Sequence, residues 1–162
     1  MKKEILMSLA GVKAYEQELE FLKTVRRKEV AKKIKTALSF GDLSENSEYD
    51  EAKNDQAILE SRIAYLEKTL NHVKIIDTNE LSTDTVGIGC TVKIKNIDTK
   101  DVEGYSMVSS NEANILEGKI SDESPVGASM MGKAVGDSFS VLVPSGMTLR
   151  YEILEIGKQS DL

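Results

Sequence analysis

The sequence contains no tryptophan, a single cysteine and only two prolines. One cysteine, Cys90, excludes an internal disulfide and any zinc site built from several thiolates. Because free cysteine is usually buried, we expect Cys90 to be a small buried residue in a strand. No apolar run approaches the roughly 20 residues of a membrane-spanning helix, and the N-terminus lacks the apolar core of a signal peptide. These absences predict a soluble, cytoplasmic protein that has no membrane partner.

Helix-breaking residues are missing from the first half of the chain. Both prolines lie beyond residue 120, and no glycine occurs between Gly11 and Gly41. Long helices are therefore permitted, and Ser8 is a candidate N-cap for a helix over about residues 8–38. Apolar positions recur at spacings of mostly three and four in this helix and in a second one after the loop. These positions, all apolar except Gln56, are Val12, Tyr15, Leu19, Leu22, Val30, Ile34 and Leu38, then Tyr49, Ala52, Gln56, Leu59, Ile63, Leu66, Leu70 and Val73.

The two apolar seams predict an antiparallel coiled-coil hairpin over residues 1–78, with an acidic tip at 41–48. A short loop makes intramolecular pairing of the two helices entropically cheap. The alternative is that each helix pairs with another chain. The hairpin within one chain is the favoured interpretation, and it predicts a monomer.

From about residue 80 the pattern changes to short segments with period-two alternation, separated by Gly, Asn and Asp. We expect five strands in an antiparallel sheet, and a short helix with Ser124 as N-cap and Pro125 in its first turn. Residues 79–162 are thus predicted to form a small α+β domain. The expected strands lie near residues 90–97, 104–110, 114–121, 139–144 and 149–156.

Charge is distributed unevenly along the chain, whose net charge is −6. Residues 1–78 carry 14 Lys or Arg against 14 Asp or Glu, whereas residues 79–162 carry 7 against 13. In the first half a basic block, KTVRRKEVAKKIK at 23–35, precedes the acidic stretch SFGDLSENSEYDEAKND at 39–55. The neutral total therefore hides two strong patches of opposite sign.

The acidic stretch has two interpretations. Asp42 and Glu45 match the D-x-x-E form of a capping box, and carboxylates near a helix N-terminus also complement its dipole. The capping interpretation accounts for two carboxylates, but less well for all six that the stretch contains. Alternatively, Asp42 and Glu45 supply two hard oxygen ligands to Mg²⁺, which rarely binds to protein alone and would need further ligands from a partner.

Long segments of the sequence resemble the bacterial Gre family of transcript cleavage factors. The resemblance is carried by GDLSENSEYDEAKNDQAILESRIAYLE, by FLKTVRRKEV before it, and by SPVGASMMGKAVGDSFSVLVPSG and YEILEI after it. It implies that the coiled coil enters the secondary channel of RNA polymerase and that an FKBP-like C-terminal domain docks at the channel entrance. The protein would then be no enzyme itself, but an accessory factor that activates the polymerase's own cleavage of the 3′ end of backtracked RNA.

The resemblance also implies roles for single residues at the tip. Asp42 and Glu45 would act as the catalytic pair, holding a weakly bound Mg²⁺ jointly with the polymerase active site and positioning a water. One ion of a metal pair favours the attacking hydroxide and the other stabilises the leaving oxygen. Further tip residues shape the loop or pack at its base: Gly41, Asn46, Glu48 and Tyr49.

The basic block has a functional and a structural interpretation. It either contacts the nascent RNA and the polymerase, which would make binding salt-dependent, or forms a solvated helix face. The candidate residues are Arg26, Arg27, Lys32, Lys33, Lys35 and Lys53.

Rival functions are a prolyl isomerase, a coiled-coil chaperone or adaptor, and an inhibitory Gre-like paralogue that occupies the channel without promoting cleavage.

Overall fold

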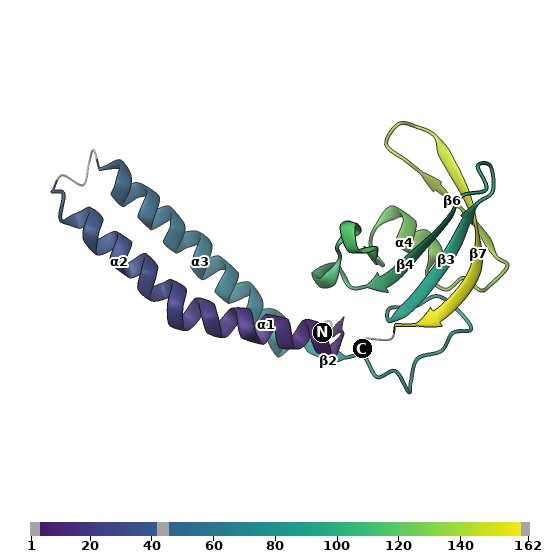
Figure 1. Ribbon diagram of the computed structural model, residues 1–162, viewed down its shortest axis with the longest axis horizontal. Coiled ribbons are helices and arrows are strands. Elements are labelled where there is room, and N and C mark those ends of the chain that lie inside the picture. Colours follow the sequence, from purple (N-terminus) through teal and green to yellow (C-terminus); the bar gives the residue numbers. More distant parts are fainter. Residues whose placement is uncertain (1–3, 42–45, 160–162) are drawn as a thin grey trace. The chain divides into compact units, whose positions relative to one another are not determined.

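The structure is a computed structural model that describes residues 4–41 and 46–159. It contains two compact units, one formed by residues 12–73 and the other by residues 4–11 together with the chain from residue 74 onward. The first unit is a helical hairpin and the second a curled sheet with a short helix, so the predicted α+β class is confirmed (Figure 1). No helix in the described part is long and apolar enough to span a membrane.

The first arm of the hairpin is a continuous helical segment interrupted by one wide turn. It consists of α1 (Leu9–Phe21), the π-helical turn η1 (Leu22–Arg26) and α2 (Arg27–Leu38). In the wide turn the backbone N–H of Arg27 donates to the carbonyl of Leu22, five residues earlier. A π-turn absorbs one extra residue without changing the face that the following helix presents. Leu22 and Val30, eight residues apart, therefore both pack in the same core.

The second arm is α3 (Ser47–Asn71), and its predicted seam is confirmed except near the C-terminal end, where Thr69 is buried and the predicted Leu70 is only half-buried. Ala52, Leu59, Ile63 and Leu66 are all buried, and Leu59 and Ile63 form a core with Val30 of the first arm. The prediction for Leu38 was wrong, because Leu38 is 45% exposed and Ala37 is 2% exposed in its place. Spacings of three and four alternate along a heptad seam, so the residue that follows Ile34 in the seam is three positions on.

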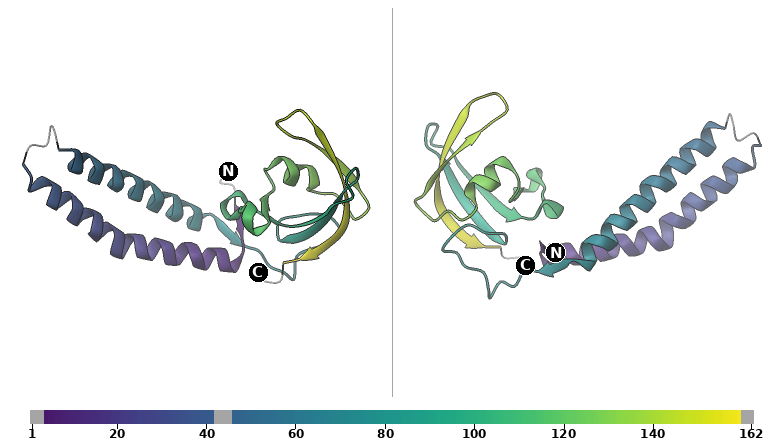
Figure 2. Two further views of the ribbon diagram at one scale, coloured as in Figure 1. Left: turned by 45° about the horizontal axis from the view of Figure 1, so that its top comes forward. Right: turned by 180° about the vertical axis from the view of Figure 1, so that it is seen from behind.

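The second unit is built on a five-stranded sheet with the strand order β5-β4-β3-β7-β6. Figure 2 shows this sheet curled around the short helix α4. The elements are β3 (Cys90–Asn96), β4 (Val102–Val108), the 3-10 turns η2 (Ser110–Glu112) and η3 (Ile115–Glu117), β5 (Lys119–Ser121), α4 (Pro125–Met130), β6 (Ser138–Leu142) and β7 (Thr148–Lys158).

The sheet is mixed, which corrects the expectation that it is antiparallel throughout. β5 pairs with β4 in the parallel sense, because the two 3-10 turns carry the chain back before β5 begins. These turns also shorten the strand expected at 114–121 to three residues. Cys90 is 1% exposed at the start of β3, as predicted.

Two further features lie outside the five-stranded sheet. A second sheet of two strands, β1 (Ile5–Met7) and β2 (Val73–Ile75), was not predicted, since three-residue strands leave almost no periodic signal. The predicted cap of α4 is confirmed, because the Ser124 hydroxyl accepts from the backbone N–H of Gly127 at 3.1 Å. A Cβ on Gly127 would lie 1.9 Å from the carbonyl oxygen of Ser121, so only glycine permits this close approach.

Candidate functional site at the hairpin tip

The tip of the hairpin was the predicted functional site, and its two central carboxylates, Asp42 and Glu45, lie outside the described residues. The structure describes what flanks them: the end of α2 up to Gly41, and α3 from its cap at Asn46. Within residues 4–41 and 46–159, no three His, Cys, Asp or Glu side chains gather in a way that could hold a metal ion. The magnesium site predicted for Asp42 and Glu45 stays a prediction.

On the α2 side, the chain leaves the helix through tight turns. The backbone N–H of Phe40 donates to Ala37 and that of Gly41 donates to Leu38, at 3.2 and 3.3 Å. Gly41 has φ +97°, a conformation that L side chains rarely adopt. Nothing lies within 4 Å of a Cβ built there, so the requirement for glycine comes from the backbone conformation rather than from crowding.

On the α3 side, Asn46 bonds to both arms of the hairpin. Its Oδ1 accepts from the backbone N–H of Tyr49 at 3.1 Å, which makes Asn46 the N-cap of α3. Its Nδ2 donates to the carbonyl oxygen of Ala37 at 2.6 Å, on the last turn of α2. A cap of this kind contributes about 1 kcal/mol to helix stability, and here it also fixes the distance between the two helix ends.

This arrangement corrects the capping-box interpretation. The helix begins at Ser47 with Asn46 as its cap, and Tyr49 occupies the position that a capping box gives to Glu or Gln. Glu48 and Asp50 lie in the first turn, where carboxylates complement the helix dipole. Tyr49 is half-buried at the start of the α3 seam. Capping α3 therefore does not require Asp42 or Glu45.

A groove of about 500 Å³ runs between the arms just below the tip. Its charged lining is mixed, with carboxylates from Glu29, Glu48 and Glu51 and ammonium groups from Lys32 and Lys33. A polyanion such as RNA needs a surface of one positive sign. The groove itself is therefore not a positively charged surface that would bind RNA. The basic side chains are described below one by one.

Two of the predicted basic residues form ion pairs across the hairpin. The Arg27 guanidinium makes two hydrogen bonds of 2.9 Å with Glu60, and the Lys33 ammonium lies 2.6 Å from Asp55. Hydrogen bonding to Arg27 lowers the pKa of Glu60, and hydrogen bonding to Asp55 raises the pKa of Lys33. Both basic side chains thus connect α2 to α3, which gives them a structural role.

The remaining predicted basic residues fall into two groups, according to whether they have a side-chain partner among the described residues. Arg26 pairs with Glu29 on its own helix, and Lys53 donates to Gln56 at 2.8 Å. Lys32 and Lys35 are exposed and have no ion-pair partner among the described residues. Lys28, which the sequence prediction missed, is also exposed and has no ion-pair partner among the described residues.

Lys28, Lys32 and Lys35 lie on one face of α2, because they are spaced by four and three residues. The seam residues Val30 and Ala37 lie on the opposite face, toward α3. We name these three residues the lysine stripe. The signal that could have identified Lys28 in the sequence is its spacing from Lys32 and Lys35, compared with the positions of the seam residues.

Comparison with known proteins gives matches over nearly the whole chain. The family model "Transcription elongation factor, N-terminal" matches residues 5–75, and "Transcription elongation factor, GreA/GreB, C-term" matches residues 81–158. The chain is 52% identical over 154 residues to "Transcription elongation factor GreA" of Clostridium novyi (strain NT), covering 95% of this chain and 96% of that protein.

Two further matches have similar coverage. The chain is 52% identical over 158 residues to "Transcription elongation factor GreA" of Thermoanaerobacter pseudethanolicus, covering 98% of this chain and 100% of that protein. Among solved structures, the GreA factor homolog 1 (Gfh1) protein of Thermus thermophilus is 30% identical, covers 95% of this chain and 99% of its own, and gives a TM-score of 0.44.

Proposed function

The chain belongs to the GreA/GreB family of transcription elongation factors, and from this membership we propose that it activates cleavage of backtracked RNA by bacterial RNA polymerase. In this proposal the hairpin enters the secondary channel, and the second unit docks at the channel entrance. The chain is an accessory factor rather than an enzyme. It works as a monomer in the cytoplasm, where the polymerase works.

The observation that supports this proposal best is the construction of the tip. Asn46 holds the ends of α2 and α3 together, and the sequence between them keeps both Asp42 and Glu45. A hairpin of two long helices with a tied tip can carry a short loop deep into another macromolecule. Because Asn46 is the N-cap of α3, we assign Asp42 and Glu45 to chemistry rather than to capping.

The proposed roles of the chain's own residues follow from their chemistry. Asp42 and Glu45 would supply two carboxylates to Mg²⁺ shared with the polymerase active site, and would orient a water toward the scissile phosphodiester. Bound Mg²⁺ supplies the activation of that water and stabilises the leaving oxygen. The lysine stripe would contact phosphates of the extruded RNA 3′ end or acidic walls of the channel.

The test uses halted, backtracked elongation complexes with Mg²⁺. Addition of the protein should accelerate release of short 3′ RNA fragments, whereas the protein alone should leave the RNA intact. Asp42→Asn or Glu45→Gln should reduce stimulation by about 10²-fold or more, the usual order for removing one catalytic group, with binding to the polymerase retained. Asp50→Asn is the matched control, because it removes a nearby carboxylate outside the pair.

The same assay separates the rival functions. An inhibitory paralogue would bind the complex and slow both cleavage and elongation, and a chaperone or adaptor would leave both rates unchanged. Stimulation that is equal in the wild type, Asp42→Asn and Glu45→Gln would overturn the role of the carboxylate pair while leaving the family membership intact.

A further inference from the structure

An aromatic side chain at the tip of the hairpin is exposed to solvent, and the proposed function does not use it. Phe40 is 64% exposed, whereas Phe139 is buried in the second unit and Phe21, at the end of α1, is 49% exposed. Phe40 comes two residues after the last residue of α2 and two residues before Asp42 in the sequence. It therefore lies where the first arm passes into the tip loop.

The backbone of Phe40 is connected to both arms of the hairpin. Its N–H donates to the Ala37 carbonyl at 3.2 Å, and the Asn46 side chain donates to the same carbonyl at 2.6 Å. The neighbouring N–H groups of Ser39 and Gly41 also donate to carbonyls of α2, at 3.2 and 3.3 Å. Because the backbone is already ordered, a contact made by the Phe40 ring has to order only its side-chain torsions.

The ring does not stabilise the hairpin core, which is centred on Val30, Leu59 and Ile63. A phenylalanine that stays in water forgoes the free energy that its burial would contribute. Replacement of Phe40 should therefore leave the stability of the hairpin intact. An effect of such a replacement on function would then come from a contact that the ring makes with another molecule.

The lysine stripe precedes this ring on the same arm. Lys28, Lys32 and Lys35 lie on one face of α2, and Lys35 is in the last turn of the helix. Proteins that bind single-stranded nucleic acid combine positive charges that follow the backbone with aromatic rings on which bases stack. The first arm supplies both in succession. This combination favours RNA over an apolar protein surface, because an apolar surface would not need the charges.

We propose that Phe40 stacks on a base of the extruded RNA and thereby positions the scissile phosphodiester for the carboxylate pair. This inference rests on the proposed function and adds to it a residue that contacts the substrate. Every base has a π-face, so the contact tolerates any RNA sequence. Purines present a larger face than pyrimidines, so the contribution of Phe40 should be greater where the stacked base is a purine.

The first test uses backtracked complexes that differ only in whether the extruded nucleotides are purines or pyrimidines. The measured quantity is stimulation, which is the cleavage rate with saturating protein divided by the rate without it. Phe40→Leu keeps an apolar side chain but removes the ring. It should lower stimulation by about tenfold, the order expected for one lost stack, and should remove the preference for purines. Phe40→Tyr keeps a ring and should retain both.

Phe21→Leu is the matched control, because it makes the same change at an exposed phenylalanine of α1, away from the tip. It should stimulate cleavage as the wild type does, with the same preference for purines. Thermal melts of Phe40→Leu and the wild type should coincide, since the ring lies outside the hairpin core.

The second test identifies the partner of residue 40 without relying on cleavage. A photoreactive benzoylphenylalanine replaces Phe40, and the protein is irradiated with backtracked complexes that hold 3′-labelled RNA and no free Mg²⁺. The expected result is transfer of the RNA label to the protein. Cross-links to polymerase subunits alone would overturn the inference in favour of a protein contact.

The two tests distinguish failure of this inference from failure of the proposed function. Equal stimulation by Phe40→Leu and the wild type on both RNAs would overturn the role of Phe40 and leave the proposed function intact. Weaker stimulation by Phe40→Leu with an unchanged preference for purines would also overturn base stacking. Absence of stimulation by the wild type on every complex would overturn the proposed function, and the role of Phe40 with it.

Discussion

Asn46 and Ala37 are joined by a hydrogen bond of 2.6 Å from the side-chain amide of Asn46 to the Ala37 carbonyl. The same side chain caps α3 through the Tyr49 N–H. One residue therefore starts the second arm of the hairpin and holds the end of the first. The positions of the two loop ends at the tip are set by this residue, together with the left-handed backbone of Gly41.

Substitutions of Asn46 should separate its two bonds. Asn46→Ala removes both and should lower the free energy of unfolding of the hairpin by about 1–2 kcal/mol. Asn46→Asp keeps a good cap acceptor but cannot donate to Ala37, so it should cost less stability and still reduce RNA cleavage. Urea unfolding followed by circular dichroism gives the first quantity, and the backtracked-complex assay gives the second. Full cleavage activity in Asn46→Asp would contradict a role for the Ala37 bond in positioning the tip.

Parts of the fold with a strong periodic signal were predictable. The predicted α3 seam alternates spacings of three and four without interruption, and Ala52, Leu59, Ile63 and Leu66 are buried as predicted, whereas Thr69 is buried in place of Leu70. The first arm deviates because η1 inserts one residue into the repeat. Leu38 was assigned to the seam because it is apolar, although the buried position is Ala37, three residues after Ile34. A π-turn leaves no local composition signal. It can be recognised only when the first arm is aligned with the seam of its partner helix, α3.

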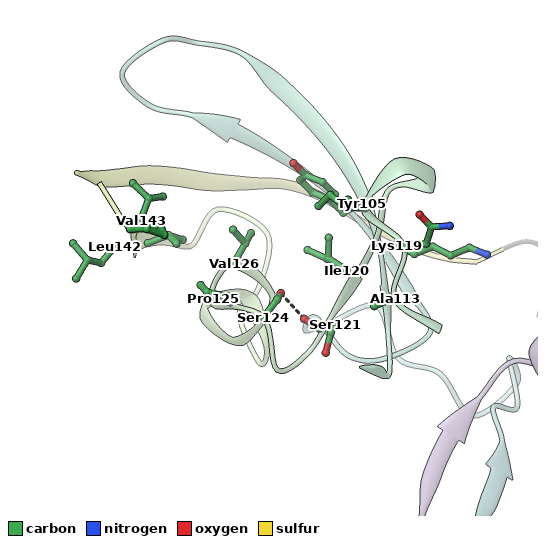
Figure 3. A pocket seen from close by; sticks show the side chains of 14 residues that line it. Tyr105, Ala113, Lys119, Ile120, Ser121, Ser124, Pro125, Val126, Leu142 and Val143 are labelled. Carbon is green, nitrogen blue, oxygen red and sulfur yellow. Dashed lines mark hydrogen bonds between the residues drawn. The ribbon is translucent and has the colours of Figure 1, made fainter. Parts of the chain in front are cut away.

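The site was predictable in residue type but not in partnership. Arg27, Lys33 and Lys32 look alike within one basic block, yet Arg27 and Lys33 pair with Glu60 and Asp55, whereas Lys32 has no ion-pair partner among the described residues. Those partners lie more than 20 residues away along the chain, so only the hairpin register identifies them. An apolar cavity of about 410 Å³ in the second unit was missed for a similar reason, because residues from β4, η3, β5, α4 and β6 converge on it (Figure 3).

The Arg27–Glu60 pair predicts a dependence of hairpin stability on pH. The pKa of Glu60 is lowered in the folded state from its ordinary value of 4.5. A lowered pKa contributes stability that is present above the unfolded value and is lost as the pH falls through the folded value. The wild type should therefore melt above Arg27→Gln at neutral pH. This difference should shrink as the pH falls below 4.5 and disappear once the pH lies below the lowered pKa of Glu60.

The check is a set of thermal melts, followed by helical circular dichroism, of both proteins across the acid range. Raised salt should also reduce the difference at neutral pH, because both side chains are exposed. Arg150→Gln, which breaks the Asp98 pair of the second unit, controls for loss of a surface charge. A difference between wild type and Arg27→Gln that persists unchanged in acid would contradict the assignment.

The lysine stripe predicts a separation of binding from stability. Lys32→Gln combined with Lys35→Gln should leave the melting temperature within about 1 °C, since surface substitutions away from such contacts have small effects. The double variant should bind backtracked complexes more weakly and with a smaller salt dependence, because fewer phosphate or acidic contacts are formed. Affinity measured at several salt concentrations gives the slope.

Lys33→Gln serves as the matched comparison for the stripe. It removes the same charge from the same helix, but it also breaks the pair with Asp55. It should therefore lower the melting temperature more than the stripe variant does and change the salt slope less. The reverse order of these two effects would show that Lys33, rather than the stripe, contacts the partner.

The π-turn predicts that one residue can be deleted from the first arm without loss of the hairpin. Deletion of Thr24 brings Leu22 and Val30 from eight to seven residues apart, which is one heptad, so a regular α-helix would keep both in the seam. The Thr24 hydroxyl bonds only to the Glu20 carbonyl at 2.7 Å, on the same helix. The melting temperature should be kept or raised. Deletion of Ala31, in the regular helix α2, should instead rotate Ile34 and Ala37 by about 100° out of the seam and lower the melting temperature strongly. Equal losses in both deletions would contradict the interpretation of η1 as a one-residue insertion.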